Sequence, residues 1–341
     1  MNKGFRVAVV GATGLVGETM ITVLEERKFP IAQLYALASN RSLGKHVRFA
    51  GQQLPVEDLA SFDFSRADIG LFSAGSEISA EYAPKAAAAG CTVIDNTSQF
   101  RYQDDIPLVV PEVNAHAISQ YRAHGIIANP NCSTIQMLVA LKPIYDAAGI
   151  ERINVATYQS VSGAGREAVE ELAAQTAALL SGRPIDAPRL IAKQIAFNCV
   201  PQIDRFEDNG YTKEEMKMFW ETRKILEDPS IRVNATAVRV PVFFGHSEAV
   251  HIETRRKITV AQARSVLEMA PGVAVIDEHQ PGGYPTAVTE AANHDTVYVG
   301  RIREDMSHER GLDLWIVADN IRKGAATNSV QIAEILVREY L

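Results

Sequence analysis

A buried strand, a glycine-rich turn and an amphipathic helix follow one another at the start of the chain. Residues 5–12 (FRVAVVGA) are almost continuously apolar, and residues 14–28 (GLVGETMITVLEERK) carry apolar side chains at helical spacing. Gly11, Gly14 and Gly17 lie around the turn between them. Such a turn lets a pyrophosphate approach the backbone at a helix N-terminus, so it favours a dinucleotide-binding unit. The spacing is GxxGxxG and not GxGxxG, so a tight turn in which Gly17 only permits helix–sheet packing is the alternative.

The same alternation continues through the first 130 residues. Apolar strands are predicted at 31–39, 67–75, 91–96 and 125–130, with a helix at 76–90 that Gly90 ends. Near-continuous apolar strands separated by helices are typical of a parallel, doubly wound α/β sheet of the Rossmann type.

After about residue 150 the pattern changes to longer, more alternating strands. Strands are predicted at 151–163, 233–245, 248–259, 295–305 and 311–320, and helices at 166–181, 212–227 and 259–270. This order predicts an α+β domain with a mainly antiparallel sheet and helices on one face. The last amphipathic helix, 325–341, is expected to return to the first domain. We therefore assign residues 1–130 and 322–341 to a dinucleotide-binding domain, and 131–321 to a catalytic and dimerisation domain.

Polar residues after the strands of the first domain are candidates for holding the dinucleotide. Residues 36–45 (ALASNRSLGK) contain no acid that could bind a ribose 2′-hydroxyl, and they offer Ser39, Arg41 and Ser42. These groups suit a 2′-phosphate and favour NADP, although Arg41 as a solvated loop side chain is the alternative. Further contacts are expected from the first turn and from a later strand end on the same edge, at Thr13, Leu15, Val16, Ser73 and Gly75.

Cys132 lies where another strand, turn and helix meet. The sequence NPNCST (129–134) follows an apolar run and precedes a predicted helix that ends near residue 149. A thiol at a helix N-terminus faces open backbone N–H groups, which lower its pKa and make it nucleophilic. A lone cysteine is more often a small core residue, and this segment alone leaves both interpretations open.

Polar residues also interrupt the apolar strands of the second domain. Gln159, Gly163 and Gly165 fall within ATYQSVSGAG, and Arg239 and His246 lie at the two ends of one apolar run. Buried Arg and His are unfavourable unless they are paired or functional. For His246 alone, a satisfied core histidine is the competing interpretation.

Three more charged residues are candidate site residues, and for each the alternative is an ordinary surface charge. Glu214 and Lys217 share one helical face, and the competing interpretation is a surface ion pair worth at most about 1 kcal/mol. Arg101, after the strand at 91–96, is either an anion clamp or a surface arginine.

Composition excludes several classes of protein. The 341 residues suit two domains, and no apolar run reaches the roughly 18 residues of a membrane span. The net charge of −7 without a basic run argues against nucleic acid as the main partner. Cys91, Cys132 and Cys199 have no metal-ligand spacing and an odd count, which indicates a reducing, cytoplasmic environment, no disulfide frame and no metal site.

The motifs taken together resemble the aspartate-β-semialdehyde dehydrogenase family. They are the GATGLVG loop, NPNCST, Gln159, Arg239 followed by GHS, and ADNIRKGAATN near the C-terminus. The resemblance extends from about residue 5 to the end of the chain. One departure is Ala237, where members often carry a cysteine, and we expect it to affect packing and not chemistry.

The resemblance implies NADPH-dependent reductive dephosphorylation of aspartyl-4-phosphate to aspartate semialdehyde through a cysteine thioester. This reaction belongs to the biosynthesis of lysine, methionine, threonine, isoleucine and diaminopimelate. Related enzymes are homodimers, with some tetramers. Two rival functions stay open: an N-acetyl-glutamyl-phosphate reductase, whose substrate has no free amine, and an inactive dinucleotide-binding paralogue.

The family also implies a role for each candidate. Cys132 is the nucleophile, His246 the acid/base, and Gln159 orients the acyl intermediate. Arg239 binds the substrate carboxylate and Glu214 its amino group, while Arg101, Asn131 and Lys217 surround the phosphate. Asn320 lies near the nicotinamide, and Gly163 and Gly165 join the cofactor-binding set.

Overall fold

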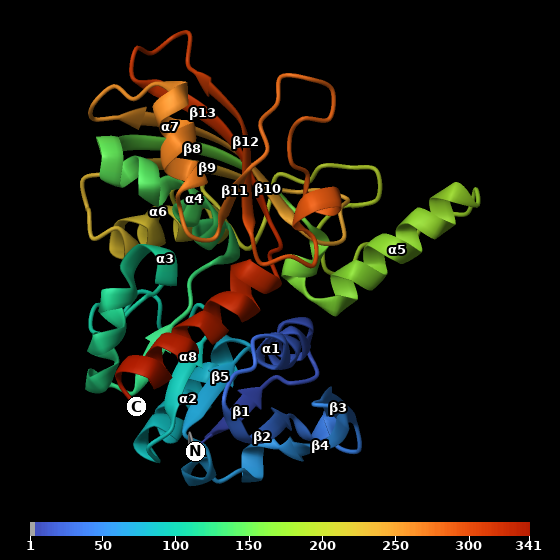
Figure 1. Ribbon diagram of the computed structural model, residues 1–341. Coiled ribbons are helices and arrows are strands. Elements are labelled where there is room, and N and C mark those ends of the chain that lie inside the picture. Colours follow the sequence, from blue (N-terminus) through green and yellow to red (C-terminus); the bar gives the residue numbers. More distant parts are fainter. Residues whose placement is uncertain (1–3) are drawn as a thin grey trace. The chain divides into compact units, whose positions relative to one another are not determined.

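The computed structural model describes residues 4–341, which divide into two compact units (Figure 1). The first runs to Asn131 and includes Ala325–Leu341, and the second is Cys132–Gly324. These limits lie within a few residues of the predicted domain boundaries.

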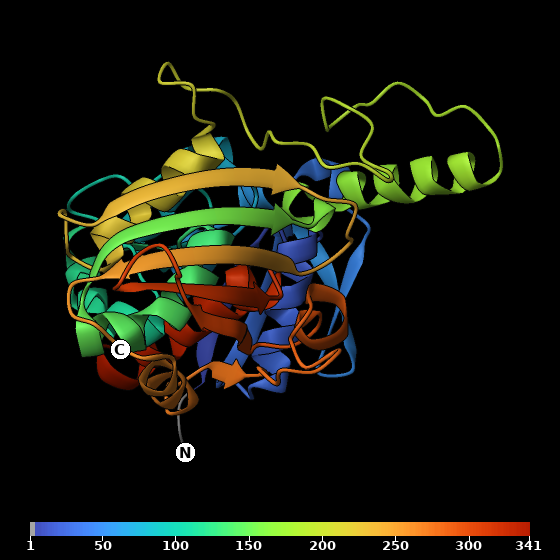
Figure 2. The same cartoon turned by 90° about the horizontal axis from the view of Figure 1, so that it is seen from above.

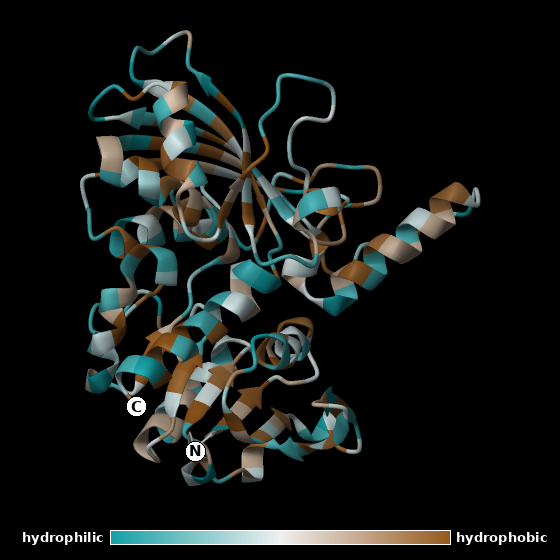
Figure 3. Cartoon of the chain, in the orientation of Figure 1, coloured by the Kyte–Doolittle hydropathy of each residue, from teal (hydrophilic) through white to brown (hydrophobic). Residues whose placement is uncertain are grey.

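The first unit is built on a seven-stranded sheet in the order β3-β4-β2-β1-β5-β6-β7. Its strands are β1 (Phe5–Val10), β2 (Ile31–Ala38), β3 (His46–Phe49), β4 (Gln52–Asp58), β5 (Ile69–Phe72), β6 (Thr92–Asp95) and β7 (Ile126–Ala128). Its α-helices are α1 (Leu15–Glu26), α2 (Ser76–Ala88), α3 (Pro111–Asn114) and α8 (Thr327–Glu339). The Rossmann-like doubly wound fold is confirmed, and Figure 3 shows apolar residues concentrated along these strands.

The sheet is not wholly parallel, because β3 pairs antiparallel with β4. The two strands are joined by Ala50 and Gly51, which both have positive φ, as a type I′ hairpin turn requires. The Asn-Gly or Asp-Gly pair that usually marks such a turn is absent, so local sequence does not predict this hairpin.

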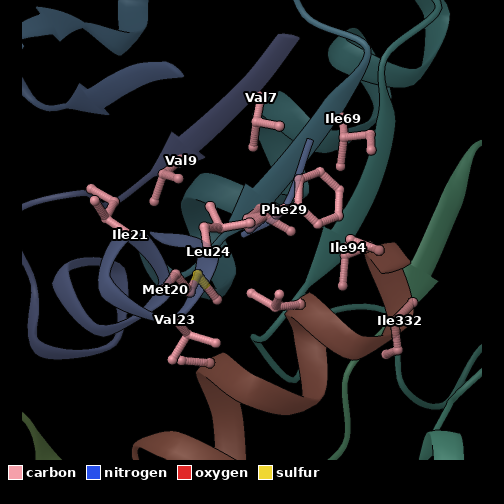
Figure 4. Close-up of a cluster of buried hydrophobic side chains, with 14 of the residues drawn as sticks. Val7, Val9, Met20, Ile21, Val23, Leu24, Phe29, Ile69, Ile94 and Ile332 are labelled. Atoms are coloured by element: carbon pink, nitrogen blue, oxygen red, sulfur yellow. The ribbon is translucent and has the colours of Figure 1, made fainter. Parts of the chain in front are cut away.

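The C-terminal helix belongs to the core of the first unit, as predicted. Val330, Ile332 and Leu336 of α8 are buried in one cluster with Val7 of β1 and Leu24 of α1. Figure 4 shows Ile332 and the β1 and α1 side chains of this cluster. The apolar stripe of the helix therefore closes one side of the sheet.

The second unit is built on a six-stranded sheet in the order β11-β12-β13-β10-β8-β9. Its strands are β8 (Ile150–Gln159), β9 (Arg232–Arg239), β10 (His246–Thr254), β11 (Val273–Val275), β12 (Val297–Glu304) and β13 (Gly311–Ala318). Its α-helices are α4 (Cys132–Ala148), α5 (Arg166–Leu180), α6 (Lys213–Ile225) and α7 (Val260–Glu268). β10 is antiparallel to β8 and β13, and β12 to β13, whereas β8–β9 and β11–β12 are parallel. The predicted, mainly antiparallel α+β domain is confirmed.

α4 packs against the sheet and against α6 and α7, and it is buried on nearly all sides. In Figure 2 the opposite face of the sheet is seen with its strands uncovered. α4 begins at Cys132, directly after β7 and the Asn-Pro-Asn turn, as the sequence predicts. The nucleophile candidate therefore occupies the first position of a buried helix.

Candidate active site

Glycines shape two turns at the carboxyl edge of the first unit's sheet. Gly11 has a φ of +87°, and a Cβ added at Gly17 would lie 2.2 Å from the carbonyl oxygen of Gly11. Gly14 and Gly75 are the N-caps of α1 and α2, and neither helix has a side-chain cap. Gly17 therefore has the packing role of the alternative interpretation, while both helix N-termini offer backbone N–H groups that suit a phosphate.

The residues predicted to hold a 2′-phosphate follow β2. Ser39 and Arg41 are exposed, and the buried Ser42 has its hydroxyl oxygen 3.2 Å from that of Thr13. This contact joins the loop after β2 to the turn after β1. Of the other predicted contacts here, Leu15, Val16 and Ser73 are partly buried.

Arg101 is not a surface arginine, because its side chain is buried. Its Nη2 donates to the carbonyl oxygen of Asn96 over 2.7 Å. Burial raises the pKa of Asp95, and Arg101 is one of the groups that oppose this rise. A buried guanidinium is a suitable anion clamp, and Asn131, the last residue before α4, is buried as well.

His246 is fully buried, and its hydrogen bonds set its tautomer. The backbone N–H of Ser160 donates to Nδ1 over 3.1 Å, so the neutral ring carries its proton on Nε2. Burial and the charge of Arg239 lower the pKa of His246 to about 3, and Glu214 opposes this shift. Nε2 itself is buried and makes no hydrogen bond to the described residues. His246 is therefore a neutral N–H donor with an open partner position, and not a satisfied core histidine.

Asn320 holds the segments on either side of His246. Its Oδ1 accepts from the hydroxyls of Ser160 (3.0 Å) and Ser162 (3.2 Å) and from the N–H of Gly245 (3.0 Å). Its Nδ2 donates to the hydroxyl of Ser162 over 3.0 Å. The amide of Asn320 is thus part of the framework around the imidazole.

Glu214 and Lys217 form a buried charge cluster. Lys217 Nζ donates to Glu214 Oε2 and to Asp204 Oδ2, both over 2.9 Å. Burial alone would lower the pKa of Lys217, but the two carboxylates raise it above its ordinary value. Glu214 Oε1 also accepts from Gln159 Nε2 over 3.2 Å. The surface ion pair considered from the sequence is therefore wrong, since Glu214 is 5% exposed.

Arg239 lies beside His246 and a glycine. Its Nη1 donates to the carbonyl oxygen of Ser160 over 2.7 Å. A Cβ added at Gly163 would lie 3.0 Å from this Nη1 and 3.4 Å from Nε2 of His246. Burial lowers the pKa of Arg239, and Glu214 and Cys132 oppose the shift. Gly163 therefore keeps free the space in front of the two side chains.

Cys132 packs against Gly324. A Cβ at Gly324 would lie 2.8 Å from the Cβ of Cys132. Cys132 is partly exposed, unlike the buried Cys91, and none of the three cysteines forms a disulfide. A core role for Cys132 is therefore not supported.

Several residues of this site were not predicted. Ser160 and Ser162 lie in a short 3₁₀ segment and its N-cap, and Asp204 lies in a loop without periodicity. Glu248 follows His246 by two residues in an apolar strand, and an acid in such a strand is a sequence signal that could have identified it.

Gly165, a predicted cofactor contact, has a φ of +95° and is the N-cap of α5, which has no side-chain cap.

Within residues 4–341, no group of three or more His, Cys, Asp or Glu side chains is arranged to hold a metal ion.

None of the helices in this described range is long and apolar enough to cross a membrane.

Two family models match the chain. One, described as "Semialdehyde dehydrogenase, NAD binding domain", matches residues 6–121. The other, "Semialdehyde dehydrogenase, dimerisation domain", matches residues 141–323.

Individual relatives are similar over their full length. The aspartate-semialdehyde dehydrogenase of Legionella pneumophila is 65% identical, over 100% of this chain and 98% of that protein. The crystal structure of aspartate semialdehyde dehydrogenase II from Vibrio cholerae, complexed with ASA, is 61% identical with a TM-score of 0.98 and covers 100% of both chains. The Candida albicans enzyme with NADP is 26% identical with a TM-score of 0.75, over 98% of this chain and 99% of that one.

These relatives favour an aspartate-family biosynthetic oxidoreductase over an N-acetyl-glutamyl-phosphate reductase or an inactive paralogue. The chain belongs to the aspartate-semialdehyde dehydrogenase family.

Proposed function

We propose that the chain catalyses the reversible, NADPH-dependent conversion of aspartyl-4-phosphate to aspartate semialdehyde and phosphate. The observation that carries this proposal is the second unit's cluster of a cysteine at a helix N-terminus, a neutral histidine and a buried arginine. Each of these groups suits one step of acyl transfer through a thioester.

Cys132 is the nucleophile in this proposal. Its thiolate attacks the acyl carbon, the bond to the phosphate oxygen breaks, and phosphate leaves. NADPH, when bound, supplies the hydride that reduces the resulting thioester. The thiohemiacetal then collapses, which releases the aldehyde and restores the thiolate. A thiol suits both halves, because it is nucleophilic near neutral pH and a thioester accepts hydride more readily than an ester.

His246 provides the proton. Its Nε2–H has no partner among the described residues and can donate to the oxygen that becomes negative when the thioester is attacked or reduced. The Ser160 N–H on Nδ1 keeps this tautomer. Gln159, whose amide donates to Glu214, orients the acyl group.

The substrate's own charges match the buried charges of the second unit. Arg239 suits the α-carboxylate through a bidentate contact, and Glu214 suits the ammonium group. An N-acetylated substrate offers no ammonium group to Glu214, whose carboxylate would then remain paired with Lys217. Lys217 already donates to Glu214 and Asp204, which leaves one of its three N–H donors for phosphate. Arg101 and Asn131 complete the proposed phosphate set.

NADP is the proposed cofactor. The loop after β2 carries Ser39, Arg41 and Ser42 and no acid between residues 36 and 45. The Candida albicans relative is described with NADP, which agrees with this assignment. The uncapped helix N-termini at Gly14 and Gly75 suit the diphosphate. The remaining proposed contacts are Gly11, Thr13, Leu15, Val16, Ser73, Gly163, Gly165 and Asn320.

We infer a homodimer formed through the second unit. The matching family model is described as a dimerisation domain. The uncovered sheet face carries Tyr158 and Trp315, whose ring centroids are 5.7 Å apart, beside a hollow that Tyr284 and Leu314 help to line. Exposed aromatic side chains of this kind are typical of a contact between subunits. A cytoplasmic location agrees with three cysteines that form no disulfide.

The test is the reverse reaction, phosphate-dependent reduction of NADP with aspartate semialdehyde. We expect turnover with this substrate and little with N-acetyl-glutamate semialdehyde. Cys132→Ala should abolish turnover and leave the fold and NADP binding nearly intact. Residual activity within about tenfold of the parent would refute the nucleophile, because loss of a covalent route has a far larger effect.

A further inference from the structure

Glu248 is a fully buried acid that the proposed chemistry does not use. It is the third residue of β10, the strand that begins with His246, and its exposure is 0%. Both carboxyl oxygens are buried without a hydrogen-bond partner among the described residues. Burial raises the pKa of Glu248 well above its ordinary value, which favours the neutral acid. Such an acid is unfavourable unless something satisfies it.

Gln136 is the polar side chain that lies against Glu248. Its side chain opposes the rise in the pKa of Glu248. Its own Oε1 and Nε2 are buried and make no hydrogen bond to the described residues. The two side chains are therefore neighbours, but the contact is too long or too poorly aligned to count as a hydrogen bond.

The four unsatisfied atoms are chemically complementary. A neutral carboxylic acid has one O–H donor and one carbonyl acceptor, and a primary amide has N–H donors and a carbonyl acceptor. Facing each other, the two groups can form two hydrogen bonds, one from the acid O–H to the amide oxygen and one from the amide N–H to the acid carbonyl oxygen. An ionised carboxylate would leave the amide oxygen without a donor.

The pair connects the two catalytic candidates. Gln136 follows Cys132 by one helical turn on α4, so both lie on one helical face. Glu248 follows His246 by two residues on β10, so both lie on one face of the sheet. Glu248 is also opposite Thr157 of β8, whose hydroxyl accepts from Gln159 over 3.2 Å.

We propose that Glu248 and Gln136 are positioning residues: a neutral acid–amide pair that fixes the first turn of α4 against β10 and so sets the thiol of Cys132 relative to the imidazole of His246. This inference rests on the proposed roles of Cys132 and His246. Neither member of the pair touches the reacting atoms.

A double-mutant cycle tests the pair. Glu248→Leu and Gln136→Met each leave one buried polar partner unsatisfied, and each should lower kcat by roughly tenfold to a hundredfold with KM changed less than about threefold. The double variant E248L/Q136M replaces both partners by apolar groups and should recover most of that loss. Losses that simply multiply in the double variant would overturn the pairing.

Glu248→Gln separates positioning from acid–base catalysis. An amide at position 248 can still pair with Gln136, so kcat should stay within about threefold of the parent. If E248Q is as damaging as E248L, the acid proton is itself needed and the positioning role is wrong. Should E248L fail to fold, E248Q, Q136M and the double variant still decide the question.

Two readouts do not depend on turnover. Alkylation of Cys132 by iodoacetamide, followed on its own peptide, should change in E248L and Q136M and return towards the parent rate in the double variant. An infrared carboxylic-acid band at neutral pH should be present in the parent and lost in E248Q. Absence of that band in the parent would overturn the neutral acid.

The matched control is Glu171, another buried glutamate of the second unit. It accepts from Gln175 over 3.1 Å and from the backbone N–H groups of Arg189 and Leu190. Glu171→Leu should destabilise the protein without changing the alkylation rate of Cys132. An equal change in the alkylation rate in Glu171→Leu would mean that any loss of stability affects Cys132, and it would refute a specific positioning role.

The proposed function and the positioning pair can fail separately. If Cys132→Ala retained activity, the proposed function would fail, while the infrared band would still report the neutral acid.

Discussion

The backbone N–H of Ser160 donates to Nδ1 of His246 over 3.1 Å, which leaves the ring's proton on Nε2. A backbone N–H cannot rotate away from the ring as a side-chain hydroxyl can. The tautomer of His246 is therefore fixed by the backbone fold. The catalytic proton of the proposed mechanism is therefore already on the nitrogen that has no partner among the described residues.

Asn320→Ala distinguishes two roles for this asparagine. Its Oδ1 accepts from Ser160, Ser162 and Gly245, so its loss should loosen the support of His246. We expect kcat to fall by roughly tenfold or more, with little change in the KM for NADP. A rise confined to the KM for NADP would instead indicate the nicotinamide contact that the family resemblance implies.

His246 should make the protein acid-sensitive. Its pKa is lowered from 6.5 to about 3 on folding, so between these values the unfolded chain binds a proton that the native state does not. Stability is then lost as pH falls from about 6.5, at up to about 1.4 kcal/mol per pH unit. In His246→Asn, denaturant titrations from pH 4 to 8 should lack this part of the slope.

Glu248 should have the opposite effect on how the stability of the protein depends on pH. Its pKa is raised on folding above 4.5, so the unfolded chain releases a proton that the native state keeps. Its contribution to stability is full below about 4.5 and is lost as pH rises. The free energy of unfolding of Glu248→Gln minus that of the parent should therefore increase from pH 5 to pH 8. A pH-independent difference would show that Glu248 is ionised in the native state.

Glu214→Gln and Glu215→Gln should have different effects. Glu214 faces Gln159 and Lys217, so its variant should mainly raise the KM for aspartate semialdehyde. Glu215 is not solvated either: it accepts from the N–H groups of Thr212 (2.7 Å) and Ala237 (2.9 Å), which anchors α6 to β9. Its variant should lower stability by about 1–3 kcal/mol with KM unchanged. Equal KM effects would contradict this assignment.

Arg41→Ala tests the choice of cofactor. If Arg41 binds the 2′-phosphate, the KM for NADP should rise roughly tenfold to a hundredfold, as expected for a charged contact worth about 1.5–3 kcal/mol. The KM for NAD should hardly change. Arg48, an exposed arginine of β3, is the matched control and should affect neither cofactor. Equal effects of R41A on both cofactors would make Arg41 structural, with Ser39 or Lys45 the next candidate.

Gly324→Ala tests the contact behind the nucleophile. The new Cβ would meet the Cβ of Cys132 at 2.8 Å, and neither atom is the end of a flexible side chain. The first turn of α4 must therefore shift, and we expect kcat to fall by roughly tenfold or more. The control is Gly14→Ala in the first unit, which should leave the alkylation rate of Cys132 unchanged.

Features that depend on neighbouring residues could be predicted from the sequence. Hydrophobic periodicity identified the strands and helices, and the Asn-Pro-Asn turn placed Cys132 at the start of α4. The need for glycine at Gly11 likewise follows from one local turn with positive φ. The family resemblance then assigned roles that periodicity alone could not.

Burial and hydrogen-bond partners were decided by the tertiary structure. Lys217 meets Asp204 and Glu248 meets Gln136 only because the chain brings distant segments together. The sequence left Glu214 as a surface acid in one interpretation, whereas packing buries it beside Gln159. The same packing excludes water from His246 and holds its pKa low. Sequence by itself determined which groups are present, and the fold decided which of them are charged and which nitrogen carries the proton, because solvation and charge depend on three-dimensional surroundings.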